Sequence, residues 1–319
     1  MFLALHDPRA ETVDILMAVY NGADTLPAQL KSFDAQSHCN WRLLASDDGS
    51  SDKTVQVLNT FGSAHPRGQV KMIKGPQQGA SENFLGLLRH VANQKPAPRW
   101  IAFSDQDDVW LPDKISRAMT TLEQCDPSLP ALYCSRTWVT CRSLSNRRIS
   151  APRPRAPHFR NALVQNIAAG NTIVLNSAAV SLVLEAVKYV GPVVVHDWWI
   201  YQLISGAGGR IVHDNVPGLL YRQHEANQIG VNDTANARLR RFLQLLRGDF
   251  RAWNQTNIAA LLSCGAALRP DHLAMLESFA RLSTLPVLKR MLLLKRLGLY
   301  RQTIGGTMTL WFAVLFRLV

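Results

Sequence analysis

Acidic side chains gather in two short segments of the sequence, 47–49 (DDG) and 105–108 (DQDD). The second segment puts three carboxylates within four residues, and such crowding is costly unless a cation neutralises the charge. Mg²⁺ and Mn²⁺ prefer oxygen ligands and often share them with the phosphates of a substrate. The 105–108 segment therefore indicates a divalent metal that bridges a diphosphate, although acidic surface turns have the same composition. The 47–49 segment, which two serines follow, is equally typical of a turn before a helix.

Four apolar runs have the length of buried strands, and a helical pattern follows each of them. The runs lie at 13–19, 42–46, 70–73 and 100–104. Strands that alternate with helices predict a parallel sheet with helices on both faces, and ligands bind such a sheet beyond the carboxyl ends of its strands. Three of the four runs end there in polar residues, at 20–22 (YNG), 47–49 and 105–108. We therefore expect both acidic segments at one edge of the sheet.

The mixed pattern continues in the second half of the chain. Segment 142–157 carries five Arg and three Pro without periodicity, which predicts either a solvated loop or a mobile flap near a phosphate-bearing ligand. A helix is expected at 178–188, a second helix opens at 196–199 (HDWW), and 211–221 is typical of a strand or a hairpin. From about residue 235 onward the pattern is helical.

Composition excludes several classes of protein. With 319 residues, 47% of them hydrophobic and 18% charged, the chain is too apolar to be disordered and has neither a collagen nor a coiled-coil pattern. Its five Cys form no CxxC pair, which argues against a disulfide scaffold or a zinc ribbon and favours a reducing compartment. The apolar N-terminal stretch is too short for the core of a signal peptide. The best candidate for a spanning helix, 303–316, has 14 residues, fewer than the roughly 18 required.

Positive charge is concentrated near the C-terminus. The formal net charge is +12, and residues 231–319 hold 13 of the 35 basic residues but only 4 of the 23 acidic ones. Such an excess indicates an anionic partner (a membrane surface, nucleic acid or a phosphorylated substrate) or an ordinary basic surface. The chain has no recognised motif for binding RNA or DNA, and its basic residues alternate with aliphatic rather than stacking aromatic side chains. Nucleic acid is therefore not expected as a partner.

The end of the chain combines leucines, cations and aromatic side chains. Leucines recur through 285–299, and an apolar aromatic segment follows at 311–316. This combination favours an interfacial helix on an anionic membrane, with a helical appendage packed on the rest of the protein as the alternative. Each basic residue close to such a membrane contributes about 1 kcal/mol to binding. Five basic residues surround the leucines: Lys289, Arg290, Lys295, Arg296 and Arg301.

The ordered motifs resemble a known enzyme family. Segments 13–33 (VDILMAVYNGADTLPAQLKSF) and 43–54 (LLASDDGSSDKT) resemble the nucleotide-binding start of the inverting family 2 glycosyltransferases with the GT-A fold, and 103–115 (FSDQDDVWLPDKI) is similar to their D-x-D segment. The rhamnosyltransferase-like branch of the family has similar later segments. These are 166–179 (NIAAGNTIVLNSAA), 196–214 (HDWWIYQLISGAGGRIVHD) and 219–227 (LLYRQHEAN). The resemblance covers residues 12–230, about two-thirds of the chain.

The resemblance implies an α/β fold of the GT-A type, with a mainly parallel central sheet flanked by helices and a C-terminal helical extension. The glycosyltransferase domain would span 1–230, with a nucleotide-binding part at 12–125 and an acceptor-side part at 126–230. A basic helical extension, membrane-associating in this interpretation, would span 231–319. The implied location is cytoplasmic, peripheral on the inner face of the cytoplasmic membrane.

The implied activity is a metal-dependent, inverting transfer of L-rhamnose from dTDP-L-rhamnose to a polysaccharide or a lipid-linked glycan. A UDP-hexose or UDP-N-acetylhexosamine donor is the alternative within the same chemistry. A membrane-associated scaffold that keeps the fold without catalysis is a further alternative, against which the retained acidic residues speak.

The resemblance also implies roles for single residues. The nucleotide-sugar would be bound by seven residues: Ala18, Tyr20, Asp47, Asn83, Asp105, Trp198 and Arg222. Asn83 could instead satisfy local backbone, and Arg222 could pair with a structural carboxylate. Mg²⁺ or Mn²⁺ would be held by Asp107, with Asp108 and His224 as further ligands. His224 is alternatively an ordinary surface residue. The general base that deprotonates the acceptor hydroxyl would be Asp197, which could also serve as a helix N-cap.

Overall fold

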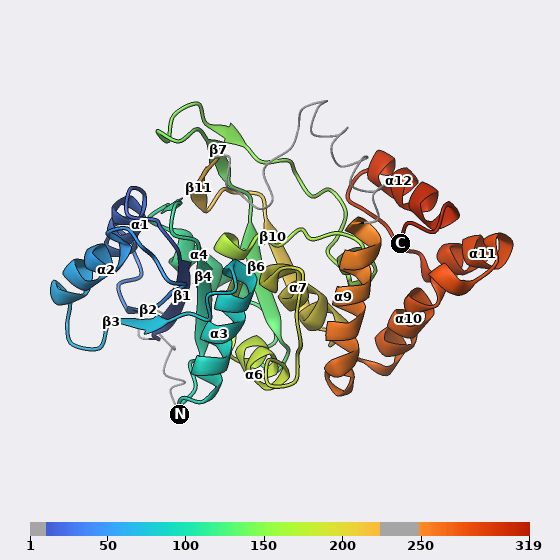
Figure 1. The fold of residues 1–319 in the computed structure, drawn as a ribbon, viewed down its shortest axis with the longest axis horizontal. Helices are drawn as coiled ribbons and strands as arrows, with labels where there is room; N and C mark the ends of the chain where they lie inside the picture. The colour runs from blue at the N-terminus through green and yellow to red at the C-terminus, as the bar shows by residue number, and fades with distance from the viewer. Residues whose placement is uncertain (1–10, 224–248) are drawn as a thin grey trace, which may run out of the picture.

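A computed structural model describes residues 11–223 and 249–319 of the chain. Its centre is a seven-stranded sheet in the order β10-β6-β9-β4-β1-β2-β3 (Figure 1). Neighbouring strands are parallel in the β4-β1-β2-β3 half and in the β10-β6 pair, whereas the short β9 is antiparallel to both of its neighbours. The strands are β1 (Val13–Val19), β2 (Trp41–Asp47), β3 (Val70–Lys74), β4 (Trp100–Ser104), β6 (Ala131–Ser135), β9 (Val174–Leu175) and β10 (Arg210–Asp214).

All four strands predicted from apolar runs are present, and the parallel arrangement of that half is confirmed. The runs at 13–19 and 100–104 match β1 and β4 to the residue. Buried strands of this kind are apolar along their whole length because helices cover both of their faces, so their ends are marked by the first polar residues.

Helices on both faces of the sheet bury two separate apolar cores. Along β1, Ile15 belongs to the core that includes side chains of α1 and α4, whereas the next residue, Leu16, belongs to the core that includes side chains of α3. Successive strand residues point to opposite faces of the sheet. Figure 1 shows α3 in front of the strands. The helices before residue 207 are α1 (Leu26–Asp34), α2 (Thr54–Ser63), α3 (Ala80–Ala92), α4 (Lys114–Glu123), α5 (Phe159–Ala162), α6 (Ser177–Ala186) and α7 (His196–Gly206).

A second, four-stranded sheet lies beside the carboxyl ends of the central strands, in the order β5-β11-β7-β8. Its strands are β5 (Val109–Trp110), β7 (Trp138–Thr140), β8 (Arg148–Ile149) and β11 (Leu219–Arg222). The 211–221 segment is therefore not a hairpin: β10 pairs with β6, whereas β11 pairs with β5 and β7 in the other sheet. The 142–157 segment is mainly loop, as predicted, but it contributes β8 to this sheet.

The described part of the C-terminal extension is helical, as predicted. It consists of α9 (Asp249–Ser263), α10 (Pro270–Ala280), α11 (Val287–Leu297) and α12 (Ile304–Leu315). Apolar side chains of all four helices join the core that contains α6 and α7, so the extension is packed onto the α/β unit. None of the helices in the described ranges is both long and apolar enough to cross a membrane.

Arg290, a basic residue of the extension, is buried, which its sequence context did not predict. Arg290 is only 1% exposed, and its guanidinium donates hydrogen bonds to the carbonyls of Leu285 and Val314. It therefore ties the start of α11 to the end of α12. The expectation that it faces an anionic partner, together with the basic residues around it, is wrong for this residue.

Candidate active site

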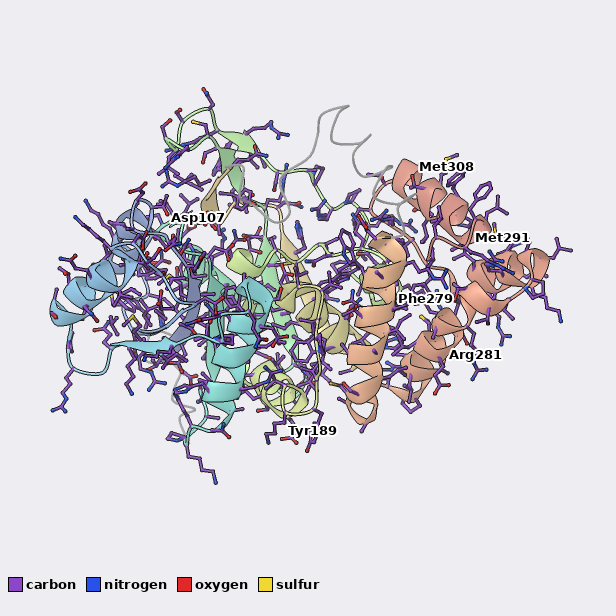
Figure 2. The ribbon with its side chains drawn as sticks, viewed as in Figure 1. Asp107, Tyr189, Phe279, Arg281, Met291 and Met308 are labelled. Atoms are coloured by element: carbon purple, nitrogen blue, oxygen red, sulfur yellow. The ribbon has the colours of Figure 1, made fainter. Side chains whose placement is uncertain are left out.

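The carboxyl ends of three central strands bring the two acidic segments to one edge of the sheet. Asp47 is the last residue of β2 and lies opposite Val19 of β1, and Asp105 directly follows Ser104, the last residue of β4, on the other side of β1. The neighbourhood expected from the sequence is therefore present. Figure 2 shows Asp107 at this edge, near the second sheet.

Gln106 links the 105–108 segment to the end of β1. Its side-chain oxygen accepts from the N–H of Tyr20 at 2.8 Å, and its side-chain NH₂ donates to the carbonyl of the same residue at 2.9 Å. A Cβ at Gly22 would lie 2.4 Å from the Gln106 oxygen, so the glycine leaves room for this contact. The Tyr20 ring itself is 57% exposed. Sequence reasoning missed Gln106, whose position inside an acidic segment is its only signal.

The 47–49 segment is stabilised by backbone donors. The Asp47 carboxylate accepts from the N–H of Ser50 at 3.2 Å, and the buried Asp48 carboxylate accepts from the N–H groups of Gln77 and Gly79 at 2.6 and 2.8 Å. Asn83 is 1% exposed and donates to the carbonyl of Ser46 at 2.9 Å. The predicted contact between Asn83 and the donor is thus not supported, because its side chain supports the end of β2 from inside.

Asp105 lies among other carboxylates. Burial, together with the negative charges of Asp107 and Asp197, raises the pKa of Asp105 to about 7. Asp107 is two residues from Asp105 in sequence. Asp197 is far from both in sequence, at the start of α7, and the fold brings its charge close to this edge of the sheet. Three carboxylates from two distant segments therefore share one electrostatic environment.

Asp108 points into the protein. It is fully buried and accepts hydrogen bonds from the Asn171 side chain and from the backbone N–H of Arg222. Burial and the charges of the neighbouring carboxylates hold its pKa well above the usual range. The buried Lys114 lies close enough for the Asp108 charge to act on its pKa, which burial lowers to about 7. The prediction that Asp108 binds a metal is therefore not supported by its position.

Arg222 holds backbone rather than a ligand. Its Nε donates to the carbonyl of Asp107 at 2.7 Å, and its guanidinium also donates to the carbonyl of Arg142. Because the side chain is 7% exposed, its predicted role of binding the donor is not supported. Arg222 instead fixes the backbone that presents the Asp107 carboxylate. His224, the other predicted ligand, lies outside the described residues.

Asp197 is held by three hydrogen-bond donors in the first turn of α7. Its carboxylate accepts from the Asn166 side chain at 3.0 Å, the Gly170 N–H at 2.8 Å and the Trp198 N–H at 2.6 Å. Burial nevertheless raises its pKa to about 6. The N-cap of α7 is Val195, so the alternative that Asp197 is the N-cap is wrong. The result is an oriented carboxylate that is more basic than an ordinary aspartate.

The aromatic neighbours of Asp197 belong to the core. Trp198 is 5% exposed and donates from its indole N–H to the carbonyl of Ala162 at 2.7 Å. The prediction that Trp198 binds the nucleotide-sugar is therefore not supported. His196 stacks on Phe84 with a centroid distance of 3.8 Å, and burial lowers its pKa to about 3, which keeps the ring neutral.

Gly170 is a second residue that sequence reasoning missed. A Cβ at this position would lie 2.8 Å from Nε2 of His196 and 3.4 Å from Cβ of Asp197. The His196 ring cannot retreat easily, because Phe84 and Phe103 flank it. The close approach lets the Gly170 N–H reach the Asp197 carboxylate.

We expect Gly170→Ala to lower kcat by about tenfold or more, because small displacements of an oriented group are costly in catalysis. Steady-state kinetics with the donor varied would measure it. Gly191→Ala is the matched control, since a Cβ there would meet nothing within 4 Å. Equal activities of the two variants would show that the Gly170 contact does not position Asp197.

The donor set at the edge fits a hard divalent cation only in part. In the described ranges, no three His, Cys, Asp or Glu side chains form a group that could hold a metal ion alone. Mg²⁺ is commonly held by one or two carboxylates together with the phosphates of a substrate, and the crowded oxygens of Asp105 and Asp107 suit that mode. The residues therefore fit a metal shared with a ligand better than a closed protein site.

A family model and a curated relative both match this chain. Residues 14–177 match the family model of Glycosyl transferase family 2. The dTDP-rhamnosyl transferase RfbG of Shigella flexneri is 27% identical over 253 residues, which cover 77% of this chain and 84% of that protein.

Two solved structures share the fold. Mannosyltransferase PcManGT from Pyrobaculum calidifontis, in complex with GDP-Man and Mn²⁺, aligns with a TM-score of 0.51 and 18% identity, covering 98% of this chain and 87% of its own. S. aureus TarS 1-349, in complex with UDP-GlcNAc, aligns with a TM-score of 0.56 and 11% identity, covering 95% and 84%. At these identities the likeness concerns the fold alone, and it agrees with the predicted GT-A architecture. Since the family model spans half of the chain, the protein belongs to glycosyl transferase family 2, the family of inverting transferases that its motifs resemble.

Proposed function

We propose that this glycosyltransferase moves L-rhamnose from dTDP-L-rhamnose to a hydroxyl of a polysaccharide or lipid-linked glycan, with inversion and with the help of a divalent metal. The observation that carries the proposal is that two adjacent residues join the 105–108 segment to the start of α7, because Asn171 donates to Asp108 and Gly170 donates to Asp197. The charge of Asp197 accordingly raises the pKa of Asp105. A scaffold without catalysis would have no use for this costly arrangement of carboxylates.

The residues at the sheet edge divide into a donor side and an acceptor side. On the donor side, the exposed Tyr20 ring and the adjoining Ala18 would border the base, and Asp47 would accept a hydrogen bond from a base N–H. Asp105 would lie near the ribose and the diphosphate, and Asp107 would hold Mg²⁺ or Mn²⁺. When bound, the cation stabilises the negative charge that develops on the departing nucleoside diphosphate. His224, which lies outside the described residues, stays a proposed further ligand.

On the acceptor side, Asp197 would take the proton from the attacking hydroxyl. The sugar carbon forms its bond to the acceptor oxygen as its bond to the diphosphate oxygen breaks, and the electron pair of that bond leaves with the diphosphate. The proton passes to the Asp197 carboxylate, which its three donors keep oriented. A raised pKa suits this role, because a more basic carboxylate accepts the proton more readily.

The raised pKa predicts how the rate depends on pH. Only the ionised form of Asp197 can accept a proton, and its pKa is about 6, so kcat/KM should rise as the pH increases through 6. Asp105, with a pKa of about 7, faces the same environment, and His196 stays neutral throughout this range. A pH–rate profile over about pH 5 to 8 would measure the rise. A rate that is flat across pH 6 would contradict the assignment of Asp197 as the base.

The identity of the donor is proposed from the similarity to RfbG, a dTDP-rhamnosyl transferase that aligns over most of both chains. The alternative is a UDP-hexose or UDP-N-acetylhexosamine, and the fold neighbour TarS is described with UDP-GlcNAc. We expect dTDP-L-rhamnose with Mn²⁺ to raise Tm more than either UDP-sugar does, because a ligand stabilises the folded state by mass action. Stabilisation by a UDP-sugar and not by dTDP-L-rhamnose would overturn the donor assignment while leaving the family chemistry in place.

A lipid-linked acceptor would place the reaction at the inner face of the cytoplasmic membrane, with the protein bound there peripherally. The basic excess of the C-terminal extension supports this location, since anionic lipids attract clustered Lys and Arg side chains.

A further inference from the structure

The last two helices leave apolar side chains uncovered on their outer faces. On α11, Leu288 and Leu292 are 80% and 68% exposed, and on α12, Ile304 and Met308 are 83% and 68% exposed. In each pair the residues are four apart, so they lie one turn apart on the same side of the helix. Figure 2 shows Met308 on α12, at the end of the molecule away from α2. We call these four residues the outer apolar face.

The opposite sides of the same helices are buried. Leu294 and Leu297 of α11 and Leu310 and Val314 of α12 belong to the core shared with α6 and α7. The buried Arg290 guanidinium joins the two helices, because it donates hydrogen bonds to the carbonyl of Leu285, just before α11, and to the carbonyl of Val314 in α12. The packing that anchors the helices therefore does not depend on the outer apolar face, which is left for another occupant.

Charge identifies the class of occupant. Residues 278–319 contain seven Lys or Arg and no Asp or Glu. On α11, Lys295 lies on the same side as Leu288 and Leu292, whereas Lys289 and Arg296 lie beside Leu292 at the edge of that side. All three cations are exposed. A surface that is both apolar and exclusively basic is complementary to an anionic bilayer, which offers phosphates above an acyl interior.

A groove on α12 adds to this surface. Ile304, Thr307, Met308 and Trp311 line a cavity of about 440 Å³ together with Arg155, whose guanidinium stacks on the Tyr300 ring at 3.8 Å. A cation among the lining residues of an apolar groove suits a lipid whose headgroup is negatively charged.

A second copy of the chain fits less well as the occupant, and the helices do not span the bilayer. A second copy of the chain would bring two sets of exposed cations together without acidic partners, and like charges at such a contact repel. The helices are also too short to span a bilayer: α11 has 11 residues and α12 has 12, compared with the roughly 20 required. Helices of this length can lie in the plane of the interface instead.

We propose that the outer faces of α11 and α12 dock the protein onto an anionic lipid bilayer. Leu288, Leu292, Ile304 and Met308 enter the boundary between headgroups and acyl chains, and Lys289, Lys295 and Arg296 stay among the lipid phosphates. The inference rests on the membrane location proposed above and names the residues that would contact lipid. Its test is separate from the proposed reaction, because vesicle binding is measured without donor, acceptor or metal.

The test is co-sedimentation of the full chain with phosphatidylcholine vesicles that contain or lack phosphatidylglycerol. The apolar variant Leu288→Gln/Ile304→Gln should bind anionic vesicles about tenfold more weakly. The charge variant Lys289→Gln/Lys295→Gln/Arg296→Gln should lose about 10²-fold at low salt. That loss should nearly disappear at about 1 M salt, where the Debye length is about 3 Å.

Matched controls change exposed residues elsewhere. Leu129→Gln/Val216→Gln alters two exposed apolar residues, and Lys31→Gln/Arg67→Gln/Lys71→Gln removes three exposed charges from the other end of the molecule. The controls should bind as the wild type does. Circular dichroism and Tm would verify that each variant is folded.

Three results would overturn the proposal. The first is a wild-type chain that does not sediment with phosphatidylglycerol vesicles at low salt. The second is an equal loss in the charge variant and its control, which would indicate attraction by net charge alone. The third is an apolar variant that changes the oligomeric state in sedimentation velocity but not vesicle binding, which would assign the face to a second copy of the chain.

Discussion

Asp197→Asn lowers kcat by about 10² or more and leaves the dissociation constant of the donor nearly unchanged. The substitution keeps the size of the side chain but removes its ability to accept a proton. Three hydrogen-bond donors surround the carboxylate, and the amide oxygen can still accept from some of them, so the fold should persist. Single-turnover kinetics would give the chemical step, and donor titration by calorimetry would give the binding.

Asp126→Asn is the control for this variant, because Asp126 is a carboxylate on a surface turn, where it accepts from Ser128. It should be as active as the wild type. If Asp197→Asn turned over at the wild-type rate, Asp197 would not be the base. Weakened donor binding with an unchanged chemical step would instead place Asp197 on the donor side.

Asp107→Ala abolishes metal-dependent transfer and leaves the fold intact. Its carboxylate shares one environment with Asp105 and lies on a segment that Arg222 and Gln106 hold through other groups, so the backbone should keep its course. Removing the carboxylate removes the anionic oxygen that a hard cation prefers. Transfer assayed across a Mn²⁺ titration, after EDTA treatment, should show no recovery in the variant and full recovery in the wild type.

The neighbouring Asp108 provides a variant with the opposite expected result, which is a loss of stability rather than a loss of the response to Mn²⁺. Asp108→Ala leaves the Asn171 side chain and the Arg222 N–H without their buried acceptor, which should lower the free energy of unfolding by about 1–3 kcal/mol. Asp107→Ala should change Tm little but remove its response to Mn²⁺. If Asp108→Ala lost the Mn²⁺ response and Asp107→Ala kept it, the two assignments would have to be exchanged.

The sequence predicted the sheet edge well because the signal there is local. Apolar runs end at the first polar residue, so β1 and β4 were placed to the residue. The acidic segments at the ends of β2 and β4, the two neighbours of β1, had to meet at one edge. The 211–221 segment shows where local reasoning stops. Its two strands look like the arms of a hairpin, but each pairs with segments 79 or more residues away, in different sheets.

The directions of side chains could not be predicted in the same way. Asp107 and Asp108 are adjacent and chemically identical, yet only Asp108 has its carboxylate turned to Asn171 in the interior. Trp198 and Asn83 are residue types that contact sugars and nucleotides elsewhere, and here burial assigns both of them to the framework. These outcomes depend on which distant groups lie opposite each side chain, and a single sequence does not contain that information.

The residues that were missed act through the backbone. Gln106 binds the main chain of Tyr20 with both ends of its amide, and Gly170 reaches Asp197 with its own N–H. Neither residue carries a charge or a nucleophile, so a search for reactive side chains passes over both. Gly170 had one available signal, since a glycine often marks a close approach of backbone to another group.

A crystal structure of the wild-type chain with Mn²⁺ and dTDP-L-rhamnose, with anomalous data collected for manganese, is the most direct test. We expect one anomalous peak within coordination distance of the Asp107 carboxylate and the donor diphosphate, and the sugar lying between that peak and the Asp197 carboxylate. Manganese bound elsewhere, or a donor whose sugar faces away from Asp197, would contradict a single catalytic pocket formed by Asp107 and Asp197.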